Sequence, residues 1–351
     1  MSATPAHHRE NYRPQLDGLR AVAVLMVLHS HFWTDWITGH YGVRLFFVLS
    51  GFLITHGLLE LRGSGENGRN LLSFYGRRVL RIWPLYYLLL GVTTLADYHD
   101  MRDYAAWHAV FASNFLFFDL GRWVPNFAAP WWSLAVEEQF YLVWPLLILW
   151  TRERILAGIV MAVIAIGAVW QVWIYTVDIG FGSSLLTPAS FDALGAGALL
   201  ALAGSKRSRM IRLLPRAGMA AAAICIVTWW AIGDCWQIEV LSVVAMAAAV
   251  HCANEGIGGW PGRILESPLM LWIGKVSFGI YLLHVLLMGT SIRLSRMLGF
   301  EDYSVVTFIG GTAASAALAS LSWYILERRA LGMKRYFPYH RSRISVAAAP
   351  A

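Results

Sequence analysis

The sequence predicts an all-α protein: a polytopic membrane helix bundle of about ten transmembrane helices, with both termini in the cytoplasm. Hydrophobic residues make up 58% of the 351 residues and charged residues only 14%, whereas soluble domains have about 45–50% apolar and about 25% charged residues. Apolar segments of about 20 residues, the length that crosses a bilayer, recur along most of the chain. Lys and Arg gather between alternate segments, as they do in cytoplasmic loops.

Eleven apolar segments are candidates for these spans. In chain order they are 16–36, 41–61, 78–96, 104–120, 131–150, 155–176, 189–204, 216–233, 237–254, 268–290 and 304–327. With a cytoplasmic N-terminus, eleven full spans would place the later basic clusters outside the cell. If segment 104–120 does not cross the membrane, one span fewer places these clusters inside. The segment is rich in aromatic rings, which are enriched in the headgroup layer, so we expect it to be interfacial or re-entrant. The two tails and the polar loop 62–77 are too short to form a second core.

Composition also excludes several classes of function. The net charge of +7 comes from the basic cytoplasmic segments, so we expect no nucleic-acid partner. The three cysteines, Cys225, Cys235 and Cys252, form no CxxC or Cys/His pattern. This spacing argues against a disulfide framework, and we expect no metal site. The polar first 15 residues are followed by no small-residue cleavage site, so we expect no cleavable signal peptide.

The first apolar segment carries an arginine and a histidine on one helix face. Arg20 and His31 are eleven residues apart, which brings them to within about 20° of each other around a helix and separates them by about 16 Å of rise. His29 falls on about the opposite face. An ionisable side chain inside a membrane is costly and is a functional-site hypothesis by default. The pair predicts a polar track from the cytoplasmic edge to a buried reaction centre.

The third span begins FYGRRVLRIWPLYY, with Arg78 and Arg81 on one helix face. One interpretation is that both arginines only anchor the helix at the cytoplasmic membrane edge. The other is that they bind a phosphorylated ligand, since guanidinium groups pair with phosphate in a bidentate way. Arg20 lies at the same edge, so all three could converge on one anion.

The fourth span begins PWWSLAVEEQFYLVWP, and Ser133, Glu137 and Tyr141 share one face. A buried carboxylate pairs with a cation or stays protonated. Glu137 and Glu138 could therefore make structural hydrogen bonds between helices, or one could orient the catalytic histidine or bind an acceptor. Spacing does not separate the two glutamates, and Glu138 is our first choice.

Among the histidines, we expect His31 to be functional, because an imidazole can take a proton from a hydroxyl near neutral pH. His29, His56, His251 and His284 are interpreted first as satisfied core residues. Asp192, Lys275 and His284 place further polar groups inside apolar helices. We expect these three, together with Ser133 and Tyr141, to bind an acceptor or to be structural.

These motifs resemble the membrane acyltransferase 3 family, which includes bacterial O-antigen, exopolysaccharide and nodulation-factor acetylases and macrolide acyltransferases. The resemblance covers about residues 12–327 and depends on five motifs in a fixed order. They are YRPQLDGLRAVAVLMVLHSH, YGVRLFFVLSGFLIT, FYGRRVLRIWPLYY, WSLAVEEQFYLVWP and IGKVSFGIYLLHV. It implies one membrane acyltransferase domain over residues 1–351 in the bacterial inner (cytoplasmic) membrane, with short cytoplasmic tails at 1–11 and 328–351.

The resemblance also implies an integral-membrane O-acyltransferase that moves an acyl group, usually acetyl, from acyl-CoA to a hydroxyl. Acyl-CoA is then a co-substrate and not a bound cofactor, and the acceptor contains carbohydrate, such as cell-surface polysaccharide. The family's motif of arginine, ten residues and histidine falls on Arg20 and His31. Its Arg-x-x-Arg motif, which engages the CoA side, falls on Arg78 and Arg81. Its fourth-span glutamates match Glu137 and Glu138.

Two positions depart from the family pattern and affect the expected acceptor pocket. Arg44 stands where relatives often carry an aspartate, and Ser190 or Phe191 stands near where an arginine often precedes Asp192. The chain ends at Ala351 before the extracytoplasmic hydrolase-like domain that some relatives carry, so we expect it to act alone or with a separate partner.

Other functions stay open at this stage. The same residues fit a macrolide or other small-molecule O-acyltransferase. A transporter or flippase for lipid-linked glycans would also line its path with charges, but such proteins favour inverted repeats, which the sequence does not show. A bis-histidine haem carrier would need His29 or His31 to face His284. A general base and an acyl-histidine nucleophile at His31 would give the same sequence pattern.

Overall fold

The computed structural model describes residues 12–34, 37–177, 180–205 and 209–341, and within these ranges the chain forms helices and no strands. The all-α prediction is confirmed. The α-helices are α1 (Pro14–Phe32), α2 (Ile37–Leu59), α3 (Asn67–Leu95), α4 (Met101–Ala109), α5 (Ser113–Leu120), α6 (Trp131–Trp150), α7 (Glu153–Thr176), α8 (Phe191–Ser205), α9 (Arg209–Ile232), α10 (Trp236–Glu255), α11 (Gly259–Leu265), α12 (Pro268–Met297), α13 (Val305–Ser322) and α14 (Arg328–Gly332). A π-helical turn over Trp323–Glu327 connects α13 to α14, and Met333–Tyr336 forms a 3-10 turn.

The segments predicted to span coincide with ten of these helices. Within the described ranges, six helices are long and apolar enough to cross a membrane, and the protein is a multi-pass membrane protein. They contain Thr38–Leu59, Glu153–Thr176, Ile211–Ile232, Trp236–Glu255, Pro268–Met297 and Val305–Tyr336. Helix α8 has only 15 residues, fewer than the about 20 that usually cross a bilayer.

Helical structure extends beyond the predicted spans in two places. Helix α3 begins at Asn67, so most of the predicted loop 62–77 is helical; a polar composition does not prevent a helix from continuing beyond the membrane edge. The predicted tail 328–351 is also folded in part, since α14 and a turn extend the structure beyond the last apolar residues. Both extensions pack against each other.

Segment 104–120 does not form one continuous helix. Helices α4 and α5 are separated by a turn in which Phe111 adopts a left-handed backbone with φ of 55°. The hydroxyl groups of Tyr86 and Tyr87 on α3 donate hydrogen bonds to the carbonyl oxygens of His108 and Ala109, at 2.8 and 2.7 Å. These bonds hold α4 against α3, and the interfacial or re-entrant placement of this segment stays a prediction.

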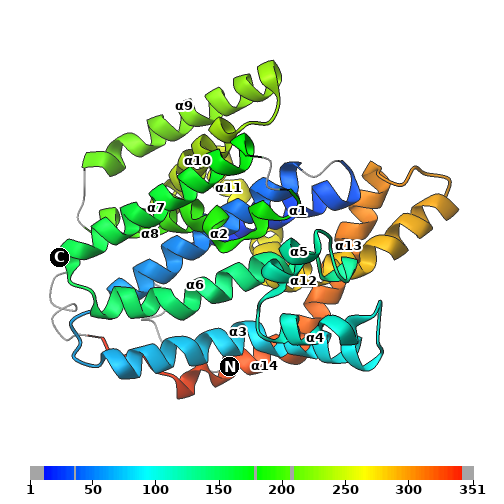
Figure 1. Cartoon of the computed structure of the whole chain (residues 1–351), viewed down its shortest axis with the longest axis horizontal. Coiled ribbons are helices and arrows are strands. Elements are labelled where there is room, and N and C mark those ends of the chain that lie inside the picture. The colour runs from blue at the N-terminus through cyan, green and yellow to red at the C-terminus, as the bar shows by residue number, and fades with distance from the viewer. Residues whose placement is uncertain (1–11, 35–36, 178–179, 206–208, 342–351) are drawn as a thin grey trace.

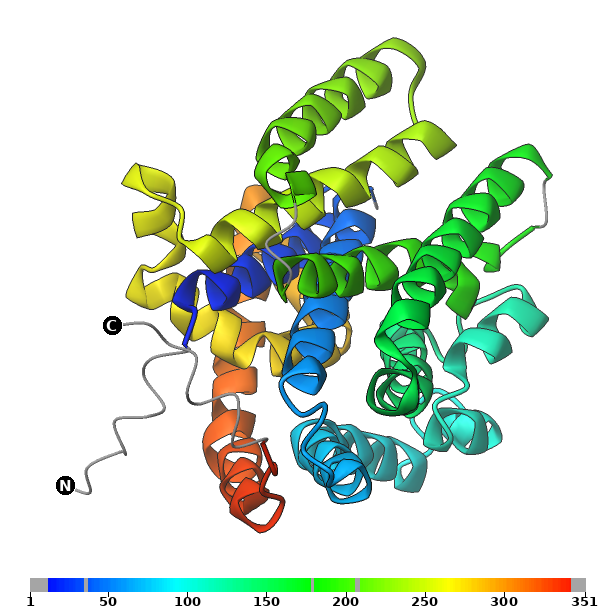
Figure 2. The ribbon, with the colours of Figure 1, turned by 90° about the vertical axis from the view of Figure 1, so that its left-hand side faces the viewer.

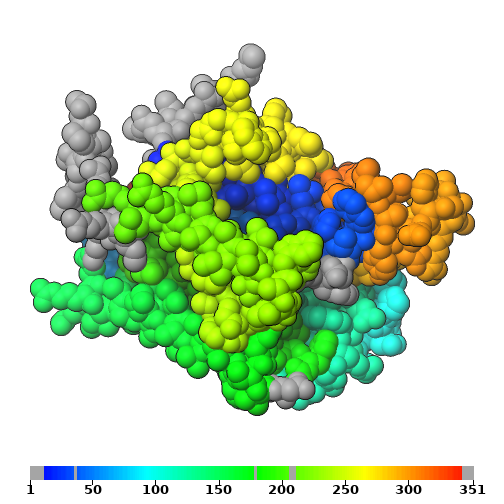
Figure 3. All heavy atoms as spheres, turned by 90° about the horizontal axis from the view of Figure 1, so that it is seen from above, coloured from blue at the N-terminus to red at the C-terminus, as the bar shows by residue number. Residues whose placement is uncertain are grey.

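Most of the long helices run along the longest axis of the molecule, and α4 and α5 lie together at one end of the bundle (Figure 1). Viewed along that axis, α9 lies at the periphery (Figure 2), where it packs on α10 and exposes apolar side chains such as Met219 and Trp230. From above, atoms of α1 are visible between the yellow-green atoms of α9 and α10 and the yellow atoms that follow them in the chain (Figure 3). Helix α1 contacts α2, α10, α11, α12 and α13.

Small residues allow α2 and α8 to approach closely at the centre of the bundle. A Cβ atom added at Gly51 of α2 would lie 2.0 Å from the carbonyl oxygen of Leu194, and one added at Gly197 of α8 would lie 2.1 Å from that of Val48. Close backbone packing through glycines is typical of membrane helix pairs. It fixes the position of α2, which carries several of the cavity-lining residues described below.

We predict that Gly51→Ala destabilises the protein, because the added methyl group meets backbone that has to move. Overpacking of this kind costs about 1–3 kcal/mol. Gly57→Ala, on the same helix, is the matched control: a Cβ there meets no atom within 4 Å. Thermal unfolding of the two purified variants in detergent should therefore show a lower midpoint for Gly51→Ala only. Equal midpoints would contradict the packing argument.

Candidate active site

A large, strongly basic cavity opens at one end of the bundle, and we call it the basic cavity. Its volume is about 640 Å³. Its lining comes from the starts of α1, α3 and α12 and from the chain around and beyond the π-helical turn: Tyr12, Asp17, Arg20, Arg77, Arg78, Arg81, Leu271, Trp272, Gly274, Lys275, Trp323, Lys334 and Tyr339. Six of these side chains are basic. Such a concentration of cations with aromatic rings between them is suited to a ligand that carries several negative charges.

Few carboxylates offset this charge. Asp17 forms an ion pair with Arg20 at 2.6 Å, and it also accepts a hydrogen bond of 2.8 Å from the hydroxyl of Tyr12. Burial and this hydrogen bond raise the pKa of Tyr12 to about 12, so its hydroxyl stays protonated. Within the described ranges, no carboxylate lies within ion-pair distance of Arg78 or Arg81. Their guanidinium groups lie over the rings of Tyr141 and Trp323, at 5.0 and 5.6 Å from the centroids.

A smaller central cavity continues from the basic cavity into the bundle. It has a volume of about 130 Å³ and shares Arg20, Arg78 and Arg81 with the basic cavity. Glu137 of α6 lines it and accepts a hydrogen bond of 2.6 Å from the hydroxyl of Ser50 on α2. Tyr141 in turn donates to the Ser50 oxygen at 3.2 Å. The basic cavity therefore leads to a buried carboxylate that accepts a hydrogen bond from Ser50, which in turn accepts one from Tyr141.

A third cavity, which we call the histidine cavity, lies toward the other end of α1. It has a volume of about 330 Å³, and His31, His40 and His284 line it. The rings of His31 and His284 meet edge to face, with 4.8 Å between their centroids. Nδ1 of His31 lies 2.9 Å from the carbonyl oxygen of Val27. Because a carbonyl only accepts hydrogen bonds, the neutral ring carries its proton on Nδ1, and Nε2 is the basic atom.

The central and histidine cavities meet at Val43 and Tyr281, which line both of them. The hydroxyl of Tyr281 shares a hydrogen bond of 2.5 Å with Ser133 and donates one of 3.2 Å to the carbonyl oxygen of Pro130. These bonds hold the Tyr281 side chain of α12 against the start of α6. The two cavities are thus arranged in series, with a hydrogen-bonded tyrosine between them.

Most of the predicted site residues line these cavities, but they do not share one channel, and Glu138 and Asp192 line none of the three. Arg20 lines the basic and central cavities, whereas His31 lines the histidine cavity. Lys275 lies in the basic cavity, with its ammonium group 5.0 Å from the ring centroid of Trp323. Their roles in catalysis or binding stay predictions.

The two adjacent glutamates point to different surroundings. Glu137 lines the central cavity. Glu138 lines none of the three cavities described here, and its buried Oε1 has no hydrogen-bond partner within the described ranges. This placement favours Glu137, and not our first choice Glu138, as the carboxylate that contacts a ligand. Spacing alone could not separate them, because adjacent helical residues differ by 100° in direction.

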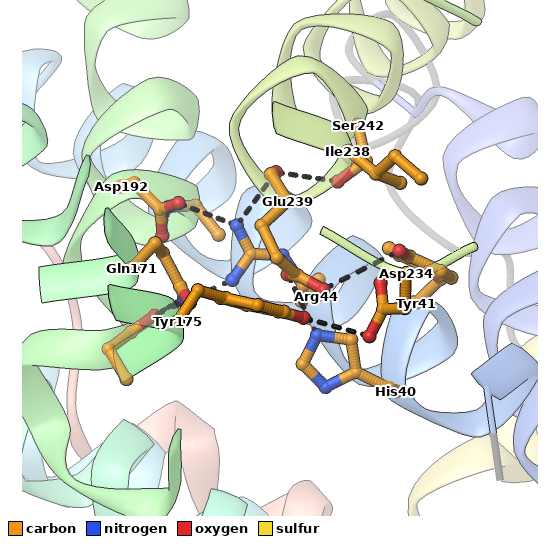
Figure 4. Close-up of polar contacts among 12 residues, drawn as sticks. His40, Tyr41, Arg44, Gln171, Tyr175, Asp192, Asp234, Ile238, Glu239 and Ser242 are labelled. Atoms are coloured by element: carbon orange, nitrogen blue, oxygen red, sulfur yellow. Dashed lines mark hydrogen bonds and ion pairs between the residues drawn. The ribbon is translucent and has the colours of Figure 1, made fainter. Parts of the chain in front are cut away.

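Asp192 belongs to a separate buried ion cluster. Figure 4 shows the Arg44 guanidinium of α2 between the carboxyl groups of Asp192 on α8 and Glu239 on α10, at 2.5 and 3.3 Å. The three side chains are each only 3% exposed. Glu239 also pairs with Nε2 of His40 at 2.9 Å. Through His40, the ion cluster reaches the wall of the histidine cavity.

Several of these residues were missed by sequence reasoning. Ser50 lies in an apolar segment beside Gly51, and nothing in the sequence indicates that its hydroxyl contacts Glu137. Glu239 looks like an ordinary acidic residue in the first turn of a helix. The one feature of the sequence that could have indicated its role is a charge at the edge of an apolar segment. Arg44, a departure from the family pattern, finds its partners on two other helices.

Comparisons with known proteins identify the family. The chain matches the acyltransferase domain family over residues 13–327. It is 28% identical over 380 residues to the peptidoglycan O-acetyltransferase OatA of Listeria monocytogenes, which covers 96% of this chain and 59% of that protein. It is 29% identical to YrhL of Bacillus subtilis, which is named provisionally as a peptidoglycan O-acetyltransferase, over 92% of this chain and 55% of that protein. No solved structure gives a significant match.

The fold is that of a helical, multi-pass membrane protein with a strongly basic cavity at one end of the bundle. The chain belongs to the membrane acyltransferase 3 family, as the motifs of its first, third and fourth predicted spans had indicated. It spans just over half the length of the curated relatives named above.

We predict that Asp192→Asn lowers stability strongly, because it leaves the buried Arg44 guanidinium with less compensating charge. Breaking a buried ion pair costs about 3–5 kcal/mol. Glu66→Gln is the matched control, since its ion pair with Arg69 is exposed and such pairs contribute about 0–1 kcal/mol. In detergent, Asp192→Asn should unfold at a clearly lower temperature than Glu66→Gln. If Asp192→Asn unfolds at the same midpoint as the wild type, the ion cluster has no structural role.

Proposed function

We propose that this protein is a membrane O-acetyltransferase that transfers an acetyl group from acetyl-CoA to a hydroxyl group of a cell-wall polysaccharide, with peptidoglycan as the first candidate. The observation that carries the proposal is the series of cavities, which leads from a cluster of arginines past Glu137 toward His31. The family and the names of its relatives supply the class of reaction.

Acyl-CoA fits the basic cavity by its chemistry. It carries phosphate groups, which guanidinium forks bind well, and an adenine base that can stack on an aromatic ring. Arg78 and Arg81 are shared by the basic and central cavities. Phosphates held at this point would direct the thioester end of the donor toward Glu137.

We further propose ten membrane passes, with both termini and the basic cavity on the cytoplasmic side of the bacterial inner membrane. The starts of α1, α3 and α12 meet at the basic cavity, while the end of α1 and the starts of α2 and α6 surround the histidine cavity. The excess of Lys and Arg at the first of these ends supports its cytoplasmic side. The donor then enters from the cytosol, and the acceptor reaches the histidine cavity from the outer side.

In the proposed reaction, Nε2 of His31 takes the proton of an acceptor hydroxyl, and the oxygen attacks the thioester carbonyl. The C–O bond forms, the C–S bond breaks, and the proton passes to the departing CoA thiol. A positioned base of this kind contributes about 10²–10⁴-fold in rate. Since Arg20 and His31 are separated by about 16 Å of helix, the acyl group has to pass Val43 and Tyr281, where the cavities meet.

One alternative from the sequence is disfavoured by the contact between His31 and His284. Their rings touch directly, with centroids 4.8 Å apart, and this contact leaves no space for a porphyrin between them. A bis-histidine haem site would require one of the two helices to move. The transporter alternative differs in its products, because it predicts glycan movement without consumption of acyl-CoA.

We predict that His31→Ala abolishes acetyl transfer without loss of folded protein. His29→Ala is the matched control on the same helix, since His29 hydrogen bonds with Thr38 outside the histidine cavity. Each variant would be returned to a deletion strain, and base-labile acetate on purified cell-wall glycan would be measured. We expect wild-type acetate with His29→Ala and the deletion-strain level with His31→Ala. If the deletion strain itself retains the wild-type amount of acetate on its cell-wall glycan, the proposed acceptor is wrong.

We predict a difference between the two glutamates in the same assay. Glu137→Gln should reduce transfer by at least about tenfold, because Glu137 lines the central cavity and is held by Ser50. Glu138→Gln should retain most of the activity, since its carboxyl group lies outside the cavities. The opposite order would assign the ligand-contacting role to Glu138. Protein amounts in the membrane, measured by immunoblot, serve as the control.

A further inference from the structure

A short segment beyond the family domain forms part of the wall of the basic cavity. The family match ends at residue 327, but the described chain continues through α14 to residue 341. We call residues 333–341 the C-terminal strap. It lies along the first turns of α3, and Lys334 and Tyr339 of the strap line the basic cavity.

Side chains of α3 fix the backbone of the strap. Asn70, which is fully buried, donates to the carbonyl oxygen of His340 at 2.9 Å and accepts from its N–H group at 2.8 Å. Ser73 donates to the carbonyl oxygen of Pro338 at 2.7 Å. These bonds satisfy backbone groups that no regular secondary structure would satisfy, so the strap has a specific position.

The strap and α3 also fit together in shape and through contacts of Arg77. The ring of Phe337 lies where a Cβ of Gly76 would be, with the nearest ring atoms 2.3 Å from that point. Arg77 donates to the carbonyl oxygen of Phe337 at 2.7 Å, and its guanidinium group lies 4.5 Å from the ring centroid of Tyr339. A larger residue at Gly76 would displace the strap.

Lys334 adds a further positive charge to the basic cavity. Its side chain is half-buried and shares the basic cavity with Arg20, Arg77, Arg78 and Arg81. No ion-pair partner lies near Lys334 within the described ranges. Like charges placed this close repel one another, and a polyanion in the cavity would relieve that repulsion.

We propose that the C-terminal strap is part of the donor-binding site, where Lys334 binds a phosphate of the donor nucleotide and the Tyr339 ring packs against its base. This inference depends on the proposed use of acyl-CoA, and it adds two residues outside the family domain to the donor site. The aromatic ring and the ammonium group come from one segment, so both depend on the hydrogen bonds of Asn70. An anionic lipid headgroup would share the phosphate chemistry but would not use the aromatic ring.

The test measures binding of 3′-phosphoadenosine 5′-diphosphate, the nucleotide part of CoA, to the purified full-length protein in detergent by calorimetry. Tyr339→Ala and Lys334→Gln should each weaken binding by about tenfold, the loss expected for one base-stacking contact or one ionic contact. Tyr339→Phe should keep near-wild-type affinity because the ring remains. Asn70→Ala should also weaken binding, since it releases the strap without removing a cavity-lining side chain.

Arg341→Gln is the matched control on the same strap, because Arg341 pairs with Glu60 at 3.0 Å and does not line the basic cavity. Its affinity should equal that of the wild type. In transfer assays, Tyr339→Ala and Lys334→Gln should raise the KM for acetyl-CoA and leave kcat nearly unchanged, a split that general misfolding would not produce. Thermal unfolding of each variant checks that it is folded.

The possible results separate this inference from the proposed function. If the wild type binds the nucleotide and both strap variants bind it equally well, the strap is not part of the site and the inference is overturned. If the wild type binds no nucleotide, the proposed donor itself is wrong. If phosphatidylglycerol in mixed micelles displaces the nucleotide, the cavity is a lipid-phosphate site and the inference is also overturned.

Discussion

The buried guanidinium of Arg44 is the interaction on which the arrangement of the central helices depends. A cation in an apolar bundle is tolerated only where carboxylates compensate it, and here they come from α8 and α10. The three helices therefore cannot separate without exposing an unpaired charge to an apolar environment. Helix α2 also carries Val43 and Ser50, which line the cavities. The ion cluster thus fixes the helix that carries these cavity-lining residues.

The proposed reaction needs two kinds of cavity, because its two substrates require different surroundings. A polyanionic donor requires dense positive charge and access from one side of the membrane, whereas a hydroxyl acceptor requires a base. The structure separates these environments and places Tyr281, held by Ser133 and Pro130, at their boundary. An open channel at this position would let water reach the thioester. The hydrogen-bonded side chain of Tyr281 lies where the two cavities meet.

The C-terminal strap, which lies beyond the family domain, belongs to the donor side of this arrangement. The strap adds basic and aromatic groups to the end of the bundle where cations already gather, and it is held by α3, the helix that carries Arg78 and Arg81. Residues that bind the strap and residues that line the cavity therefore move together. A helix that begins well outside the apolar segment makes this possible, since the residues of its first turns are free to hydrogen bond with another part of the chain.

The sequence by itself determined the helical class, the position of most helices and the family, because hydrophobic length and local motifs are properties of consecutive residues. It also placed Arg20 and His31 on one helix and singled out the pair Glu137 and Glu138. Only the tertiary structure decided that Glu137 and not Glu138 lines a cavity, that Arg44 pairs with Asp192 and Glu239, and that the strap lies on α3. Each of these depends on contacts between residues far apart in the chain. A periodic pattern gives the direction of a side chain around its own helix, but not the neighbour it meets.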